Sequence, residues 1–492
     1  MTRNSGWLTL SVLAVLATSV AENADAQITL ETLTFQNGAN GYDGAFDRRI
    51  DMRLIDENEG TFADASEDGA SVDTDVDPFF IDGDPVDSSR SDYLIRFDDI
   101  LGDMGIPSGA IILDATLNLR TTSESVNANS RTGESYNVYR LAVPFDSTST
   151  MDGTFGDGND MFTDNVDGVE PEQGEADWIL STFDHPVDEG GLEPDMTYGA
   201  SVTRAVQSWV DGATNYGLAV MSDHRDNDDG WSVHSTGSST VSSRPELSVT
   251  YTISPLMRVN EFQQGLNGYT GTTDVLLNLV TDTASTDERD DDTVVGGLDA
   301  STESEVFLDG SNATPEEPNV GNSYDTPYLI KFDDVESLGD NGRRVYKAEL
   351  LVTTGFSSGV SDSGGPFTVH QLLTPFDTTS VYGDYSGDVN DMLAANEIAP
   401  EAARFESIDE GEYVAVDVTS VVDNWFSGDP NYGFYIGANG TSNGWQIFTS
   451  GAIDSDLAPM LRIYTVPEPA SVMLGAFGLL ALAVYRRRPN AC

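Results

Sequence analysis

Cysteine is almost absent from this sequence, and histidine is scarce. The single cysteine is Cys492, so one chain can form neither a disulfide framework nor a cysteine-based metal site. The four histidines are His185, His224, His234 and His370, and their spacing does not match that of metal ligands. The sequence therefore predicts no site of the zinc-finger or disulfide-scaffold kind.

Basic residues are also few. The chain has 23 Lys plus Arg against 83 Asp plus Glu, which gives a formal net charge of −60. Nucleic-acid binding requires a basic surface, so a nucleic-acid partner is not predicted. Such a charge suits Ca²⁺ binding, a salty medium or simple solubility.

Signs of catalysis and of long helices are missing too. No His-Glu-x-x-His motif or P-loop occurs, and acid pairs mean little among 83 acids, so no enzyme is predicted. The 492 residues contain 39% hydrophobic residues, enough for a sizeable core, together with 47 glycines and 20 prolines. Abundant turn residues with few helical patterns favour β-sandwiches.

Each end of the chain carries a sorting pattern. Residues 1–26 have Arg3, an apolar run from Leu8 to Ala17 and a small-x-small site at Ala24–Ala26, which predicts a secretory signal peptide and a secretion translocon as partner. At the other end, Pro467-Glu468-Pro469 precedes an apolar run of residues 470–485 and three arginines. That run predicts a transmembrane segment, although a short one.

This C-terminal arrangement, residues 466–492, resembles the PEP-CTERM sorting signal of bacterial exported proteins. The match covers Pro467, Glu468 and Pro469. The resemblance implies a transient hold at the membrane, processing by an exosortase, and a final place outside the cell or on its surface. An ordinary tail anchor is the alternative.

Between the two ends the chain repeats itself. YLIRFDD at 93–99 returns as YLIKFDD at 328–334, and YNVYRLAVPFD at 136–146 returns as FTVHQLLTPFD at 367–377. A short helix is predicted in each copy, from an apolar stripe ending at Trp209 and another ending at Trp425, and Asn-Tyr-Gly plus a strand follow each helix. The tryptophans are interpreted as core anchors, with an exposed sugar-stacking role as the alternative.

The repeat predicts two homologous domains, residues 28–254 and 257–465. Most matched blocks alternate apolar and polar residues between turn signals, the pattern of strands with one buried face. The predicted fold class is all-β: two tandem antiparallel β-sandwiches of jelly-roll type, each with one short helix.

The matched blocks also resemble the DNRLRE-type domain, which is related to carbohydrate-binding module family 96. The strongest parts are the Trp-x-x-Gly…Asn-Tyr-Gly segment and the closing strand after Arg244-Pro245. The second copy departs from the pattern, with Ala458 in place of the arginine. The resemblance implies a non-catalytic β-sandwich that binds extracellular polysaccharide.

Acidic turns make Ca²⁺ the candidate ion, and no other cofactor is predicted. Asp223, Asp226 and Asp228 lie in a turn without the spacing of an EF-hand. A second acidic motif recurs, as Asp157 and Asp160 in the first copy and as Asp388 and Asp391 in the second. Both motifs have an alternative: a solvated acidic hairpin for the first, and Asx-turn geometry for the second.

Four further residues are candidate carbohydrate contacts. Arg96 and Lys331 recur at the same strand position, where the alternative is a cross-strand ion pair with a recurring aspartate. Tyr42 and Tyr269 recur in Asn-Gly-Tyr turns, where each ring either stacks on a pyranose or closes the sandwich.

Three functions follow from these observations. The leading hypothesis is an exported protein that binds extracellular polysaccharide, either a neutral one or an anionic one bridged by Ca²⁺. The alternatives are a structural matrix or surface-layer protein without a discrete sugar site, and a polysaccharide-processing enzyme. An exposed aromatic strip would favour the first, smooth polar faces the second, and a deep cleft with a carboxylate pair the third.

Overall fold

The computed structural model describes most of the repeat region. It covers residues 28–56, 61–64, 72–73, 77–82, 89–102, 105–122, 136–149, 176–182, 194–222, 230–281, 294–308, 323–355, 367–386, 389–405, 413–438, 445–453, 455 and 457–468. The predicted signal peptide and the apolar run of residues 470–485 lie outside these residues. No helix in the part that is described has both the length and the apolar character needed to cross a membrane.

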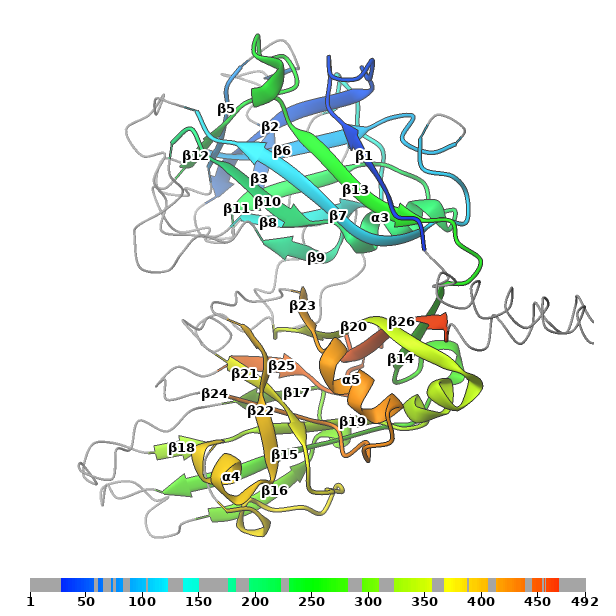
Figure 1. Cartoon of the computed structure of the whole chain (residues 1–492). Helices are drawn as coiled ribbons and strands as arrows, with labels where there is room; N and C mark the ends of the chain where they lie inside the picture. The colour runs from blue at the N-terminus through cyan, green and yellow to red at the C-terminus, as the bar shows by residue number, and fades with distance from the viewer. Residues whose placement is uncertain are drawn as a thin grey trace, which may run out of the picture.

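The first half of the chain forms two antiparallel sheets (Figure 1). One has four strands, in the order β1 (Glu31–Phe35), β13 (Glu246–Thr252), β7 (Ile111–Arg120) and β10 (Thr197–Ser201). The other follows the order β12 (Gly230–Val233), β5 (Phe79–Asp82), β6 (Ser89–Phe97), β11 (Leu218–Ser222), β8 (Tyr136–Leu141) and β9 (Ala176–Thr182). To this second sheet β2 (Ala45–Asp56) is added through β6, and it also pairs with β3 (Thr61–Asp64) and β4 (Val72–Asp73).

The second half repeats this arrangement. Its four-stranded sheet has the order β14 (Arg258–Gln263), β26 (Met460–Pro467), β20 (Arg343–Thr353) and β23 (Tyr413–Asp417). The larger sheet runs β16 (Val294–Asp299), β15 (Thr272–Thr281), β19 (Tyr328–Phe332), β24 (Phe434–Ala438), β21 (Phe367–Leu372) and β22 (Ile398–Phe405), with β18 (Ser323–Asp325) beside β15. A separate pair joins β17 (Glu305–Leu308) to β25 (Trp445–Phe448).

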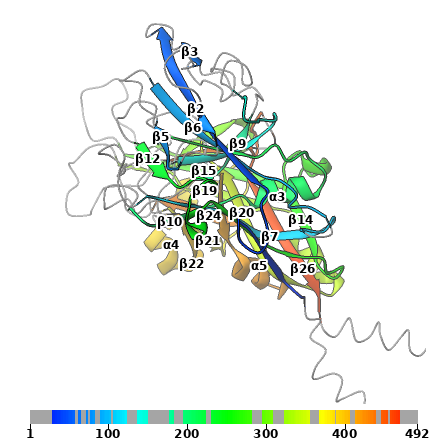
Figure 2. The ribbon, with the colours of Figure 1, turned by 90° about the horizontal axis from the view of Figure 1, so that it is seen from above.

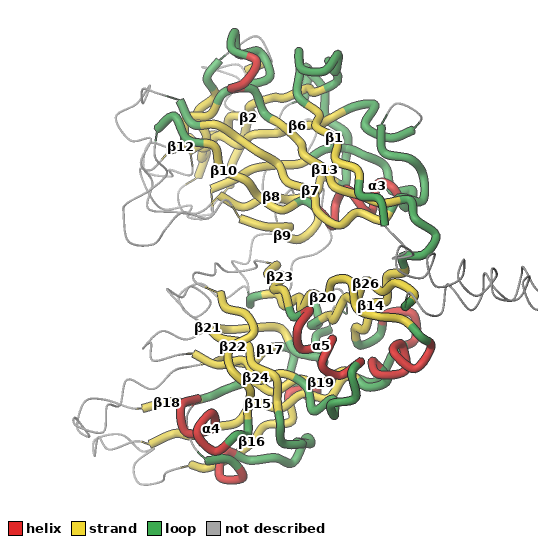
Figure 3. Tube along the Cα trace, viewed as in Figure 1, coloured by secondary structure: helices red, strands yellow, loops and turns green. Residues whose placement is uncertain are grey.

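Strand periodicity explains why these segments pair into sandwiches. Along β7 every second residue from Ala115 to Leu119 is buried while the residues between them are partly open, as expected for a strand with one face in a core. In the first half, side chains such as Leu117 and Val249 from one sheet meet Ile95 and Val220 from the other in one apolar cluster. The predicted all-β, antiparallel sandwich fold is confirmed, and strands dominate the chain trace in Figure 3.

Short helices follow the predicted stripes. α3 (Thr203–Val210) packs on β7 and buries Val206 and Trp209, and α5 (Thr419–Phe426) packs on β20 and buries Val422 and Trp425. Both tryptophans are 2% exposed, which is the core-anchor position. The second half has an additional helix, α4 (Val389–Ala395), that the sequence did not predict, because an acidic Gly-Asp-x-Asn-Asp segment reads as a turn.

One buried carboxylate links the elements of each sandwich. Asp47, on β2, is fully buried and accepts hydrogen bonds from the Tyr93 hydroxyl (2.9 Å), the Thr236 backbone N–H (2.7 Å) and the Thr236 hydroxyl (2.5 Å). In the second half Asp274 accepts from the Tyr328 hydroxyl (2.6 Å) and from the backbone and hydroxyl of Ser450 (2.8 and 2.5 Å). Each carboxylate thus ties two strands to the segment after β12 or β25.

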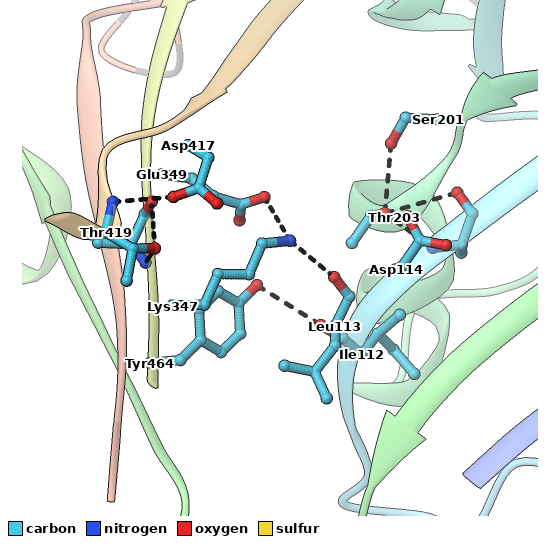
Figure 4. A network of polar contacts seen from close by, with 12 residues as sticks. Ile112, Leu113, Asp114, Ser201, Thr203, Lys347, Glu349, Asp417, Thr419 and Tyr464 are labelled. Atoms are coloured by element: carbon cyan, nitrogen blue, oxygen red, sulfur yellow. Dashed lines mark hydrogen bonds and ion pairs between the residues drawn. The ribbon is translucent and has the colours of Figure 1, made fainter. Parts of the chain in front are cut away.

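The two halves meet at an irregularity in β7 (Figure 4). Leu113 stands opposite no residue of β13, because the register shifts between the pairs Asp114–Thr250 and Ile112–Tyr251. Its free carbonyl accepts a hydrogen bond from Lys347 Nζ of the second half (3.1 Å), and the same Nζ is 2.8 Å from Glu349. We call this contact the seam.

Apolar packing completes the seam. Leu113 packs in one buried cluster with Met257, Tyr464 and Val466, so side chains of both halves share a small core. The Lys347 ammonium lies 5.9 Å from the centre of the Tyr464 ring, close enough for a cation–π contact. The halves are therefore packed on each other as well as being joined by the chain.

Asp47 gives the fold a specific dependence on pH. Burial raises the pKa of Asp47 to about 6, from 3.8, although its three hydrogen bonds oppose the shift. Since the folded state holds the proton more tightly, the stability from this group is complete below the unfolded pKa and falls as the pH rises to about 6. The two-unit shift corresponds to at most about 3 kcal/mol.

The variant Asp47→Asn cannot ionise, so we expect its stability not to fall through ionisation at this position as the pH rises. The difference in unfolding free energy between the unmodified chain and Asp47→Asn should shrink as the pH rises from about 4 to 7. Urea unfolding across that pH range measures it, with the exposed Asp195→Asn as control. A difference that stays constant or grows with pH would contradict the assignment.

Candidate functional site

Arg96 lies on the outer face of the larger sheet in the first half. Its guanidinium bonds both oxygens of Asp98 (2.6 and 3.2 Å) and the carbonyl of Phe145 (2.8 Å). Its charged carbon also lies 5.8 Å from the Phe46 ring centre and 5.3 Å from that of Phe145. The ion-pair partner, Asp98, is therefore not on a neighbouring strand, where it was expected. It follows Arg96 by two residues, and residues i and i+2 of an extended chain share a face.

Lys331 repeats this placement. Its Nζ is 2.7 Å from Asp333, and the Lys331 side chain is 30% exposed, compared with 20% for Arg96. Both cations therefore remain partly open to solvent while each holds a carboxylate beside it. A cation paired with an acid at a sheet surface offers donors and acceptors together, which is what sugar hydroxyls require.

Tyr42 and Tyr269 lie at sandwich ends and are largely occupied by the fold. The Tyr42 hydroxyl donates to the Asp98 carbonyl (2.9 Å), and its ring meets Phe35 edge-on at 5.3 Å. Tyr269 likewise donates to the Asp333 carbonyl (3.1 Å) and meets Phe262 at 5.4 Å. Burial, with help from the neighbouring aspartates, raises the pKa of both phenols.

The Asn-Tyr-Gly motif next to Arg96 has a clear division of roles. Asn215 donates to the Phe97 carbonyl (2.8 Å) and accepts from the Gly217 backbone N–H (3.1 Å), so it locks the turn. A Cβ on Gly217 would lie 2.5 Å from the Ile95 carbonyl oxygen, and the glycine φ is +102°. Asparagine and glycine are thus required by the backbone, and Tyr216 between them is half-buried.

The same turn recurs in the second half. Asn431 donates to the Phe332 carbonyl (2.8 Å) and accepts from the Gly433 N–H (3.1 Å), and a Cβ on Gly433 would lie 2.3 Å from the Ile330 oxygen. Tyr432 is half-buried, like Tyr216.

In each half, the turn that carries the tyrosine passes next to the strand that carries the cation. A Cβ on Gly217 would be 3.0 Å from both Arg96 Cβ and a ring carbon of Phe145, and one on Gly433 would be 2.9 Å from Lys331 Cβ. Tyr216 packs with Phe46 on the apolar cluster that includes Phe145, and Tyr432 packs on the cluster that Phe376 also borders. We define the Arg96 surface as Phe46, Arg96 and Tyr216, which lie over the buried Phe145, and the Lys331 surface as Lys331, Phe376 and Tyr432.

Most of the candidate calcium ligands cannot be placed. Asp157, Asp160, Asp223, Asp226, Asp228 and Asp388 lie outside the described residues. Asp391 is described. It is exposed in the first turn of α4, where a carboxylate interacts favourably with the helix dipole. Among the residues that the structure describes, no group of three or more acidic, histidine or cysteine side chains could hold a metal ion.

The C-terminal motif begins inside the fold. Pro467 is the last residue of β26 and lies opposite Arg343, and the Glu468 backbone N–H donates to the Gly342 carbonyl (2.9 Å). Pro469 lies outside the described residues.

Comparison with known proteins identifies this tail. Residues 465–488 match the model of the PEP-CTERM protein-sorting motif, whereas no curated protein matches the chain. The protein is therefore exported, anchored transiently at the membrane by its C-terminal tail and then placed at the cell surface, and the motif is a substrate signal for exosortase processing.

Two solved structures share little with the chain. Allantoicase from Saccharomyces cerevisiae is 8% identical over 76% of each chain, with a TM-score of 0.15. The CBM32-1, CBM32-2 and M60 catalytic domains of ZmpB from Clostridium perfringens are 8% identical, with a TM-score of 0.18, over 90% of this chain and 38% of theirs. Scores this low carry no argument about fold or function.

Tyr216, Tyr432 and Phe376 were not among the residues predicted to bind carbohydrate. All three lie in the recurring blocks, so the sequence did contain a signal. The turn geometry supplies what was missing, because it shows that the residues flanking each tyrosine serve the backbone.

Crowding at the Asn-Tyr-Gly turn can be separated from backbone strain. Gly428 has φ +111° with open space around its missing Cβ, whereas Gly433 has φ +91° and a carbonyl oxygen in the way. We expect Gly428→Ala to cost about 1–2 kcal/mol from strain alone. Gly433→Ala should cost about 3 kcal/mol or more in urea unfolding, because overpacking adds to the strain. Equal costs for the two variants would contradict a role for the close approach.

Proteolytic removal of the tail should leave strand β26 intact. Because the chain is bonded into the sheet through Glu468, we expect the mature C-terminus to fall after Glu468, and Cys492 to be lost. Intact-mass spectrometry of the protein released from cells measures both. A mature chain that still ends at Cys492, or that ends before Glu468, would contradict this expectation.

Proposed function

We propose that this protein is a non-catalytic polysaccharide-binding protein of the extracellular matrix or cell surface. In this proposal the chain carries two DNRLRE-type modules, residues 28–254 and 257–465, that reach their site of action through the sorting tail. The observation that carries the proposal is the recurrence of a half-buried tyrosine beside a paired cation, as the Arg96 surface and the Lys331 surface.

The chemistry of the two surfaces suits a sugar chain. The exposed part of a half-buried tyrosine ring offers an apolar face for the C–H groups of a pyranose, and its hydroxyl offers a hydrogen bond. The Arg96–Asp98 and Lys331–Asp333 pairs add charged donors and acceptors for hydroxyl groups. Tyr42 and Tyr269 hold the adjacent turns in this scheme.

Charge restricts the class of polysaccharide. A net charge of −60 repels an anionic polymer, so the proposed ligand is a neutral glycan, or an anionic one bridged by Ca²⁺ at the acidic turns. Two surfaces on one chain raise the apparent affinity when one polymer reaches both.

The test is affinity electrophoresis of the chain through gels that contain neutral or acidic polysaccharides, with Ca²⁺ or with EDTA. We expect particular neutral glycans to retard the chain, and EDTA to leave that retardation unchanged. The double variant Tyr216→Ala/Tyr432→Ala should raise the apparent dissociation constant about tenfold or more, because buried aromatic contacts dominate such interfaces.

A matched control is Phe307→Ala, which removes a 37% exposed aromatic side chain from β17, in another sheet. It should leave the retardation unchanged. Retardation by no glycan would instead favour a structural matrix protein. An equal loss in the control would remove the assignment to the two surfaces.

A further inference from the structure

The chain leaves its fold beside three arginines. Pro467 ends β26, and the backbone bond from Glu468 to Gly342 is the last one described before the sorting tail. Across the sheet, Arg343 lies opposite Pro467, Arg344 opposite Val466 and Arg258 opposite Thr465. Figures 1 and 2 show the end of β26 with β14 and β20 beside it.

These arginines surround the exit point on both faces of the sheet. Paired residues share a face, so Arg258 lies on the side of Thr465, and Arg344 lies on the side of Val466. Arg258 and Arg344 are exposed, and Arg343 is half-buried. Among the side chains described at this end of the sandwich, the three arginine charges outnumber the Glu468 carboxylate.

The arginines at the exit lack acidic partners. Three other cations are paired with acids: Arg404 with Glu401, Arg462 with Glu261 and Lys331 with Asp333. Within the described residues, the side chains of Arg258 and Arg344 make no ion pair or hydrogen bond. Arg343 bonds only neutral oxygens, the Leu256 and Thr465 carbonyls (both 2.7 Å) and the Thr465 hydroxyl (2.9 Å).

Arg343 lies close enough to Arg258 for their charges to repel each other. Burial lowers the pKa of Arg343, and the charge of Arg258 lowers it further. In a protein with 83 acidic residues, a group of arginines that form no ion pair among the described residues is a distinct feature of the surface. Exposed apolar side chains accompany it, namely Val259 at 36% and Tyr346 at 38% exposure.

We propose that this surface, formed by Arg258, Arg343, Arg344, Val259 and Tyr346, docks on anionic phospholipid headgroups while the tail holds the protein at the membrane. We call it the exit surface. One residue spans at most about 3.6 Å, so the start of the anchoring tail keeps the exit surface near the bilayer. Arginines next to a membrane anchor are attracted to anionic lipid, and tyrosine favours the membrane–water interface.

The exit surface also answers a problem that the net charge creates. An anionic bilayer repels the protein as a whole, so a tethered chain would hold its domains away from the membrane. Three unpaired cations at the tether make one end of the protein attractive to the bilayer. An anionic polysaccharide would be attracted to the same charges, but the tail places the bilayer directly at the exit point.

The experiment uses the full chain reconstituted by its tail into vesicles. Cys492→Ser removes the native thiol, and Val259→Cys carries an environment-sensitive dye on the exit surface. We compare vesicles of phosphatidylcholine alone with vesicles that also contain phosphatidylglycerol. Ile453→Cys, at an 81% exposed position that precedes the opposite end of β26, is the control label.

We expect the dye at position 259, and not the one at 453, to report a lipid environment only in the phosphatidylglycerol vesicles. Raising the salt from about 0.1 M to 1 M shortens the screening length from about 10 Å to about 3 Å and should release the surface. Arg258→Gln/Arg344→Gln should lower the ratio of docked to undocked protein about fivefold for each arginine.

The matched control is Arg120→Gln/Arg404→Gln, which removes the same charge from cations that have acidic partners elsewhere. It should leave the dye signal unchanged. An equal loss in this control would show a general charge effect and overturn the proposal. A dye signal that ignores anionic lipid, but responds to an added anionic polysaccharide through Arg258 and Arg344, would overturn it too.

Discussion

Each sandwich depends on a carboxylate that has no contact with water. Asp47 and Asp274 come from a chain crowded with solvated acids, yet each is buried where two strands meet a returning segment. Burying a charge is costly unless hydrogen bonds compensate for it, and here three donors converge on each group. The same three connections recur in both halves, so the carboxylate fixes where the segment after β12 or β25 returns to the sheet.

That fixed segment determines what the outer face of the larger sheet can present. With the inner face packed against the second sheet, side chains of opposite parity, such as Leu94 and Arg96 on β6, point outward. The Asn-Tyr-Gly turn then crosses so close to β6 that only glycine fits, and the tyrosine is left at the rim. Because acidic residues are abundant, a cation on this surface commonly has a carboxylate next to it, as Arg96 has Asp98.

Much of this architecture could be predicted from the sequence. Recurring blocks of alternating apolar and polar residues predicted the sandwiches, and the apolar stripes predicted α3 and α5. Both patterns indicate an element with one buried face. Helix α4 was missed because its acidic start resembles a turn. The partners of Arg96 and Lys331 were expected across strands but lie along them, and period-two spacing already contained that answer. A glycine is required at position 217 because the turn passes close to the backbone of β6. No local sequence pattern indicates such a contact between distant segments.

The hydrogen bond of the seam depends on a difference between the two copies. Its hydrogen bond runs from Lys347 of the second copy to the bulged residue of the first, and the position equivalent to Lys347 in the first copy is Asp114. A carboxylate cannot donate to a main-chain carbonyl, so the first copy has no donor for the bulge of another molecule. The second copy's own donor is already used within the chain. This hydrogen bond therefore runs from the second copy to the first, and the equivalent residues cannot form it in the opposite direction.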